Sequence, residues 1–182
     1  MTTALMIIDM QMLMQERINN GREHVNHHAP AKIAALLATF RASGQPVIHI
    51  RHADSDPASP LAPTAPGYQV MPCAQELATE PLFIKSSSSA FASTTLENYL
   101  HDNGITHLLV TGAVAGFCVN STVRAGADLG FQMTVVQDAV LGFDVPPSPL
   151  SAQTIFDATM ALLAADFATL TDTSSVSELL GQ

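Results

Sequence analysis

Basic residues are scarce in this chain of 182 residues. It has seven lysines and arginines against sixteen aspartates and glutamates, which gives a formal net charge of −9. Binding to nucleic acid or to an anionic membrane surface needs a basic face, and this composition offers little material for one. The sequence therefore argues against both kinds of partner.

Cysteines are few, and long apolar runs and glycine-rich phosphate motifs are missing. Two cysteines, Cys73 and Cys118, are too few for a disulfide framework or a zinc site. No run approaches the roughly 20 apolar residues of a membrane helix, and no basic segment of a signal peptide precedes the first apolar run. We expect a cytoplasmic protein that binds no nucleotide cofactor.

Hydrophobic residues, in contrast, make up 47% of the chain, enough for one domain over residues 1–182. Short apolar runs alternate with segments of helical periodicity. The predicted strands are 4–8, 46–50, 81–84, 107–111, 132–136 and 168–170, and the predicted helices are 31–42, 94–103, 117–129 and 151–165. Non-alternating strands separated by helices are typical of a parallel sheet covered on both faces, so we predict a doubly wound α/β fold.

Three reactive side chains fall at the ends of predicted strands. Asp9 follows the first strand, Lys85 the third, and Cys118 lies just past the fourth, at the start of a helix. Taken singly, Asp9 could equally be a helix cap, whereas a lone lysine is usually a solvated side chain and a lone cysteine is usually a small buried one. Ligands bind at the carboxyl ends of the strands in doubly wound sheets, so the coincidence predicts one shared crevice.

These residue types suit hydrolysis of an amide-type bond. A thiolate is a nucleophile, and a helix start and a nearby ammonium both favour it. A carboxylate can take the thiol proton and later deliver it to a leaving amine. Free N–H groups at the helix start can bind the developing oxyanion. We therefore expect Cys118 to form a thioester, with Asp9 and Lys85 as its partners.

Four segments carry a resemblance to a known family. They are LMIIDMQ (5–11), KSSSSAF with TTL after it (85–96), TGAVAGFCVNSTVRAGADLGF (111–131) and VVQDAV (135–140). They resemble the isochorismatase-like cysteine hydrolases, which include nicotinamidase-type amidases. The resemblance implies a six-stranded parallel sheet of order 3-2-1-4-5-6, a catalytic triad of Asp9, Lys85 and Cys118, and a homo-oligomer.

The resemblance also implies details around the cysteine. A non-proline cis peptide would lie at Val114–Ala115, with the Ala115 and Cys118 N–H groups serving as oxyanion donors. Many members have threonine where this chain has Ala115. The Asp-x-His metal motif of nicotinamidases is not matched by HIRHADSDP (49–57), so we expect no metal ion, no other cofactor and a substrate other than nicotinamide.

The substrate is expected to be a small molecule that lies against four further side chains. The candidates are Gln11, His52, Phe91 and Phe117. The proline-rich segment 53–72 is too long for a simple connection, which indicates a loop that covers a site. Three histidines at 24, 27 and 28 fit a solvated face better than a metal site, because their spacing matches no standard ligand pattern.

Alternative functions remain open on the sequence. Vinyl-ether hydrolysis, as in isochorismatases proper, needs an acid such as Asp9 but no thiol. A phosphorylation-dependent signalling domain would need an aspartate where this chain has Lys85. A catalytically silent paralogue used for assembly would keep the fold without turnover.

Overall fold

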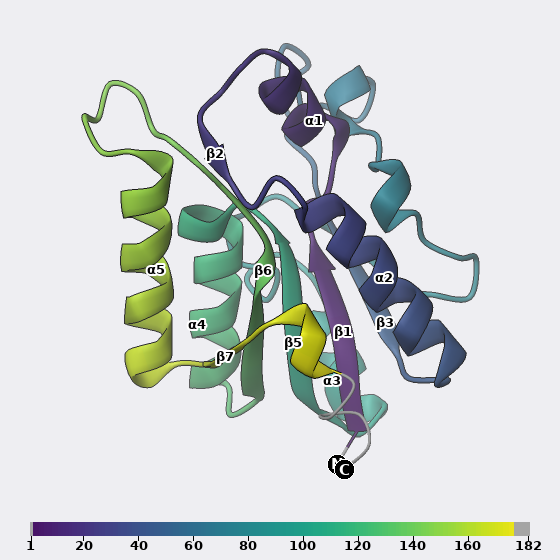
Figure 1. The fold of residues 1–182 in the computed structure, drawn as a ribbon. Helices are drawn as coiled ribbons and strands as arrows, with labels where there is room; N and C mark the ends of the chain where they lie inside the picture. Colours follow the sequence, from purple (N-terminus) through teal and green to yellow (C-terminus); the bar gives the residue numbers. More distant parts are fainter. Residues whose placement is uncertain (1, 177–182) are drawn as a thin grey trace.

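A mostly parallel sheet forms the centre of the computed structural model, which describes residues 2–176 (Figure 1). Its six parallel strands are β1 (Thr2–Ile8), β3 (Val47–His52), β4 (Leu82–Lys85), β5 (Ile105–Ala113), β6 (Gln132–Phe143) and β7 (Thr169–Thr171). They follow the order β4-β3-β1-β5-β6-β7. The doubly wound α/β fold and the strand order 3-2-1-4-5-6 are thereby confirmed.

A seventh, antiparallel strand was missed by the sequence reading. β2 (His24–Val25) pairs with the far end of β6 through His24↔Phe143 and Val25↔Gly142. A strand of two residues is too short to show a periodic pattern in the sequence. Its partner residues lie in the part of β6 beyond residue 136, where the predicted strand ended. This pairing places residues 24–25 beside the carboxyl end of β6.

Helices cover both faces of the sheet, as predicted. They are α1 (Met12–Asn19), α2 (Ala29–Ala42), α3 (Leu96–Asp102), α4 (Asn120–Asp128) and α5 (Ala152–Asp166). One apolar cluster joins α1 and α2 to the sheet, and the other joins α3, α4 and α5. Met6 and Ile8 face the second cluster while Leu5 and Ile7 face the first. Both faces of β1 are therefore buried, which explains why its sequence does not alternate.

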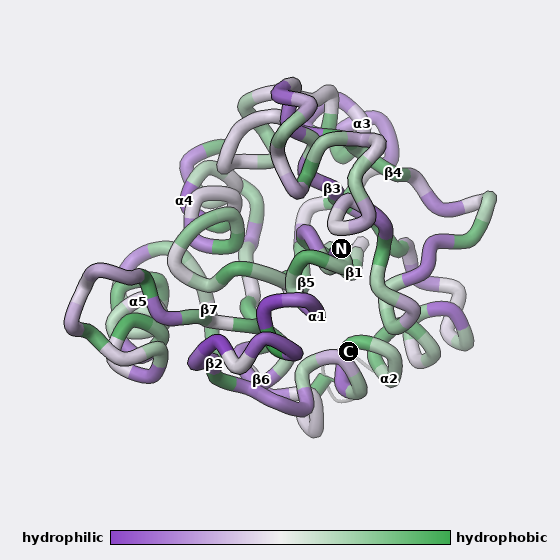
Figure 2. The backbone as a smooth tube through the Cα atoms, turned by 90° about the horizontal axis from the view of Figure 1, so that it is seen from above, coloured by the Kyte–Doolittle hydropathy of each residue, from purple (hydrophilic) through white to green (hydrophobic). Residues whose placement is uncertain are grey.

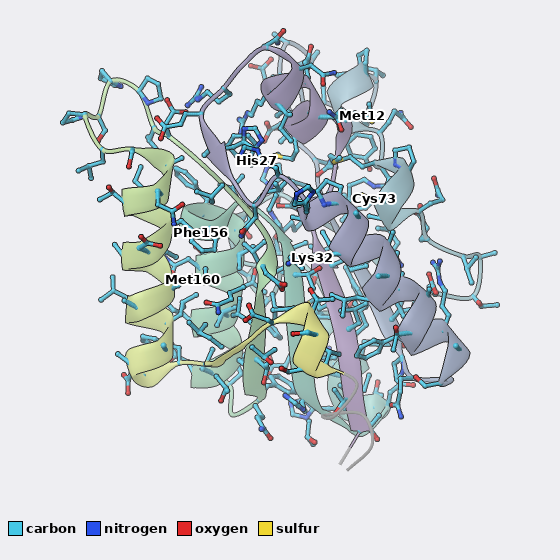
Figure 3. The ribbon with its side chains drawn as sticks, in the orientation of Figure 1. Met12, His27, Lys32, Cys73, Phe156 and Met160 are labelled. Atoms are coloured by element: carbon cyan, nitrogen blue, oxygen red, sulfur yellow. The ribbon has the colours of Figure 1, made fainter. Side chains whose placement is uncertain are left out.

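Figure 3 labels side chains from the helices on the two faces of the sheet. Phe156 and Met160 extend from α5 into one apolar cluster, and Lys32 lies on α2 at the opposite face. Among the described residues, no helix is long and apolar enough to cross a membrane.

The carboxyl ends of the strands are covered by α1 and by the segment that follows β3. Figure 2 looks down on this end and shows α1, whose residues are half apolar and half hydrophilic, over the middle of the sheet. The Met12 N–H donates to the Gln69 carbonyl at 2.7 Å, and the Met71 N–H donates to the Met10 carbonyl at 2.8 Å. The long loop is thus attached to the start of α1, above the place where a ligand is expected.

Candidate active site

Asp9 terminates β1 in an uncommon backbone conformation. Its φ is +49°, a left-handed value that aspartate tolerates better than most residues. The Asp9 N–H still continues the sheet by donating to the Ile50 carbonyl at 3.0 Å. Here the chain turns out of the sheet, and the buried carboxylate is placed at the floor of a cavity.

Lys85, at the end of β4, brings the three predicted catalytic residues together. Its fully buried ammonium lies 2.7 Å from Asp9 Oδ2 and donates to Cys118 Sγ at 3.2 Å. It also donates to His52 Nδ1 at 2.9 Å and to the Ser87 carbonyl at 3.1 Å. A buried ammonium is costly without such partners, so these contacts hold the side chain in one position.

Cys118 lies in a π-helical turn, Ala115–Val119, that leads into α4. Burial and the neighbouring Asp9 carboxylate raise the pKa of its thiol to about 11, although Lys85 acts in the opposite direction. The helix start and the ammonium were expected to favour a thiolate. In the resting site, burial and Asp9 outweigh Lys85, and the sulfur keeps its proton at neutral pH.

The Asp9 carboxylate is suited to take that proton. Burial raises its pKa, and the contact with Lys85 offsets only part of the rise. Asp9 Oδ1 is buried and has no hydrogen-bond partner among the described residues. A carboxylate oxygen of Asp9, the Cys118 sulfur and a ring nitrogen of His52 all lie within 4.8 Å of one another. The carboxylate thus lies close to the thiol and has one oxygen left to accept a hydrogen bond.

The same three side chains are the candidates for holding a metal ion, but the donor set fits one poorly. Asp9, His52 and Cys118 each offer a ligand atom. All three groups already contact the buried Lys85 ammonium. A divalent cation would have to take a place beside this fixed positive charge, which Coulomb repulsion disfavours.

A cavity of about 240 Å³ opens above these side chains. Its wall is formed by Asp9, Met14, Arg17, His52, Leu61, Ser88, Ala113, Val114, Phe117 and Cys118. The predicted pocket residues His52 and Phe117 are both present, and Leu61 shows that the long loop contributes to the wall. Phe117 is 51% exposed, so its ring stands at the opening rather than in the core.

Two of the predicted substrate-binding residues do not line this cavity. Both faces of the Gln11 amide are used by backbone: it donates to the carbonyls of His52 and Tyr68 at 2.9 and 3.0 Å, and it accepts from the His52 N–H at 2.9 Å. Phe91 stacks on Phe131 in the core, with ring centroids 5.7 Å apart. Gln11 therefore ties the loop to the sheet, and Phe91 packs under α4.

The backbone before Cys118 corrects one prediction. The non-proline cis peptide is Ala113–Val114, one bond earlier than the predicted Val114–Ala115. Ala113 and Val114 line the cavity, whereas Ala115 is buried in the core. Ala115 itself is not among the residues that line the cavity, and the role of the Ala115 and Cys118 N–H groups as oxyanion donors stays a prediction.

Gly112 allows β1 and β5 to lie close together beside the site. Its φ is +118°, and a Cβ at this position would lie 2.1 Å from the Ile8 carbonyl oxygen. Ile8 immediately precedes Asp9, and the chain after Gly112 leads to Cys118. The missing side chain lets these two residues approach from neighbouring strands.

Sequence reasoning overlooked two charged residues of the site, Asp54 and Arg17. His52 Nδ1 accepts from Lys85, so His52 Nε2 carries the proton and donates to Asp54 Oδ1 at 2.9 Å. The spacing of Asp54, two residues after His52, was the available signal. Arg17 lines the cavity from α1, a helix that was not predicted.

Comparison with known proteins supports one family. The family model of the isochorismatase domain matches residues 3–174. YrdC, an isochorismatase family protein of Bacillus subtilis, is 30% identical over 95% of this chain and 93% of its own length. A streptothricin hydrolase of Streptomyces noursei is 30% identical over 91% of this chain and 58% of its own length.

The fold agrees with these sequence matches. A crystal structure of an isochorismatase family member from Chromobacterium violaceum superimposes with a TM-score of 0.93, at 29% identity, over 99% of this chain and 94% of that one. Fold, strand order and sequence match together show that the chain belongs to the isochorismatase family of hydrolases.

Proposed function

We propose that the protein is a metal-independent cysteine hydrolase that cleaves an amide-type carbon–nitrogen bond of a small molecule. One observation carries the proposal: the buried Lys85 ammonium contacts both Asp9 Oδ2 and Cys118 Sγ at the floor of a cavity. A nucleophile, a base and a fixed positive charge thereby lie within one hydrogen-bond network, which is the requirement for covalent catalysis by a thiol.

In the first half of the reaction, Asp9 takes the Cys118 proton as the sulfur attacks the substrate carbonyl carbon. The carbonyl electron pair moves to oxygen, and a tetrahedral intermediate forms. The carbon–nitrogen bond then breaks, and Asp9 gives its proton to the leaving nitrogen. The raised pKa of Asp9 suits this double duty, because the group must accept a proton and release it again.

Water completes the cycle at the thioester. Asp9 takes a proton from a water molecule as the water oxygen attacks the carbonyl carbon. The carbon–sulfur bond then breaks. The proton returns from Asp9 to the Cys118 sulfur, so the enzyme ends as it began. Lys85 stabilises the transient thiolate in both halves by direct contact with the sulfur.

The relatives are consistent with hydrolysis but do not name a bond for this chain. One of them is a hydrolase of streptothricin. The preference for a carbon–nitrogen bond rests on the site itself, where an acid lies close to the thiol. An amine is a poor leaving group until it is protonated, and Asp9 can supply that proton.

The proposal is tested by ammonia release from a panel of small primary amides and ureido compounds, with intact-protein mass spectrometry during turnover. We expect Cys118→Ala to lose turnover and an acyl adduct to appear on Cys118 of the wild-type protein. Cys73→Ala is the matched control and should keep both activity and adduct. Hydrolysis of an amide by Cys118→Ala at the wild-type rate would contradict the proposal, as would turnover of a vinyl ether without any adduct.

A further inference from the structure

Arg17 is unusual among the basic residues of this acidic protein. Five of the seven lysines and arginines form ion pairs with carboxylates: Arg22, Lys32, Arg41, Arg51 and Lys85. Arg124 donates to the Asn120 side chain and lies over the Phe167 ring at 4.2 Å. Arg17 lies over the Phe143 ring at 5.7 Å and has no carboxylate within 4.0 Å among the described residues.

The position of Arg17 makes this lack of a partner informative. It stands in the last turn of α1, half-buried, and lines the same cavity as Asp9 and Cys118. Burial and the nearby Arg22 lower its pKa, yet a guanidinium keeps its charge at neutral pH. A partly desolvated cation beside another cation is unfavourable unless an anion compensates it.

We infer that the substrate is a small amide whose other end carries a carboxylate, and that Arg17 binds this carboxylate while the amide carbonyl faces Cys118. The inference rests on the proposed function and names its substrate class. The planar guanidinium offers two parallel N–H groups that match a carboxylate. The nearby Lys85 is already paired with Asp9, so Arg17 leaves one positive charge for the ligand, which matches a carboxylate better than a doubly charged phosphate.

The cavity also limits the size of this substrate. Its volume of about 240 Å³ is below the roughly 300 Å³ at which pockets for drug-sized ligands begin. A short chain between the amide and the carboxylate therefore fits, and a large ring system does not. The ring of Phe143 lies 5.7 Å from the Arg17 guanidinium carbon, and this cation–π contact helps to hold the guanidinium in place.

Two alkylating reagents test the inference without requiring a known substrate. Iodoacetate and iodoacetamide have nearly the same shape and differ in charge, and both transfer their carbon to a thiolate with loss of iodide. Peptide mass spectrometry gives the rate constants at Cys118 and at Cys73 in the same molecule. Burial raises the thiol pKa of both cysteines to about 11, so Cys73 is an internal reference.

We expect the ratio of the iodoacetate to the iodoacetamide rate constant to be roughly tenfold higher at Cys118 than at Cys73, in line with one hydrogen-bonded charge pair. Arg17→Met should lower the Cys118 ratio by about the same factor, and Arg17→Lys should retain part of it. Arg124→Met, which removes the other arginine without a carboxylate partner, should leave the ratio unchanged.

Equal ratios at the two cysteines of the wild-type protein, or a Cys118 ratio that survives Arg17→Met, would overturn the inference. Either result would leave the cysteine hydrolase proposal intact, because that proposal depends on turnover by Cys118. Conversely, amide turnover that survives Cys118→Ala would remove the proposed function even if Arg17 attracts anions.

Discussion

Two largely buried carboxylates, Asp9 and Glu80, each lie against a basic side chain and behave in opposite ways. Glu80 accepts from Arg41 at both oxygens, at 2.7 and 2.8 Å, and from the Leu77 N–H and His49 Nε2 at 2.9 Å. Burial alone would raise its pKa, but these hydrogen bonds lower it to about 2. Asp9 has Lys85 and a free oxygen, and its pKa is raised.

The difference between the two groups shows what sets the pKa of a buried carboxylate in this fold. Burial and a nearby cation are common to both. What differs is the number of hydrogen bonds to the ionised form, because each donor that the native structure supplies stabilises the charge. Glu80 is saturated and serves to fix the β3–β4 edge of the sheet, whereas Asp9 keeps an unsatisfied oxygen beside a thiol.

The largest effect should come from neutralising the unsaturated carboxylate. Asp9→Asn removes the proposed base for the Cys118 proton, and we expect kcat/KM to fall roughly 10³-fold, within the range for general acid–base groups. Glu80→Gln is the matched exchange at the saturated carboxylate and should change kcat/KM by less than about threefold. Steady-state kinetics on one amide substrate measures kcat/KM for both variants. Equal losses in the two variants would contradict the difference proposed between Asp9 and Glu80.

The second prediction concerns the stability that the saturated carboxylate provides. Glu80→Gln leaves Arg41 and His49 without their anionic partner, and we expect the free energy of unfolding to fall by about 1–3 kcal/mol at neutral pH. Urea denaturation of the variant and the wild-type protein measures the change. A loss below about 0.5 kcal/mol would mean that the Glu80 contacts do not stabilise the sheet edge.

The third prediction separates the charge of Asp9 from its role as a base. The Asp9 carboxylate helps to raise the thiol pKa of Cys118 to about 11, so Asp9→Asn should lower that pKa. We expect Cys118 to react about tenfold faster with iodoacetamide at pH 8, the effect of one pKa unit, even as turnover is lost. The Cys73 rate is the control, and an unchanged Cys118 pKa would show that Asp9 does not act on the resting thiol.

The smallest effect is a pH dependence of the Glu80 contribution. The native pKa of Glu80, about 2, lies below the ordinary value of 4.5, so its stabilisation is fully present above pH 4.5 and is lost as the pH falls toward 2. The stability gap between wild type and Glu80→Gln should therefore narrow over this window. Denaturation at several acidic pH values tests this, and a constant gap down to pH 2 would contradict it.

The strand-end positions could be read from the sequence because a parallel sheet repeats one geometric rule. Apolar runs without alternation mark the buried strands, and the residue after each run lies at the same edge. Asp9 and Lys85 are placed by that rule, and Cys118 lies in the turn that follows the next strand along the chain. Their meeting at Lys85 Nζ follows from the strand order, which the family resemblance supplied.

The rest of the site depended on contacts between distant segments. Gln11 has the right position for the cavity, but the backbone of the long loop takes up its amide. Phe91 is next to the site in sequence and turns into the core against Phe131. Arg17 lies on a short helix whose place is fixed by the long loop and by β2, and no local pattern reveals such an arrangement.

Gly112 sets a boundary for any redesign of the cavity of this protein. The wall positions Met14, Leu61 and Phe117 are side chains that can be exchanged to change the shape of the cavity. At Gly112, even a methyl group would meet the backbone of Ile8 and force β1 and β5 apart. A mutant library that spares this one position keeps Cys118 and Asp9, the proposed nucleophile and base, on closely paired strands, whatever specificity is selected around them.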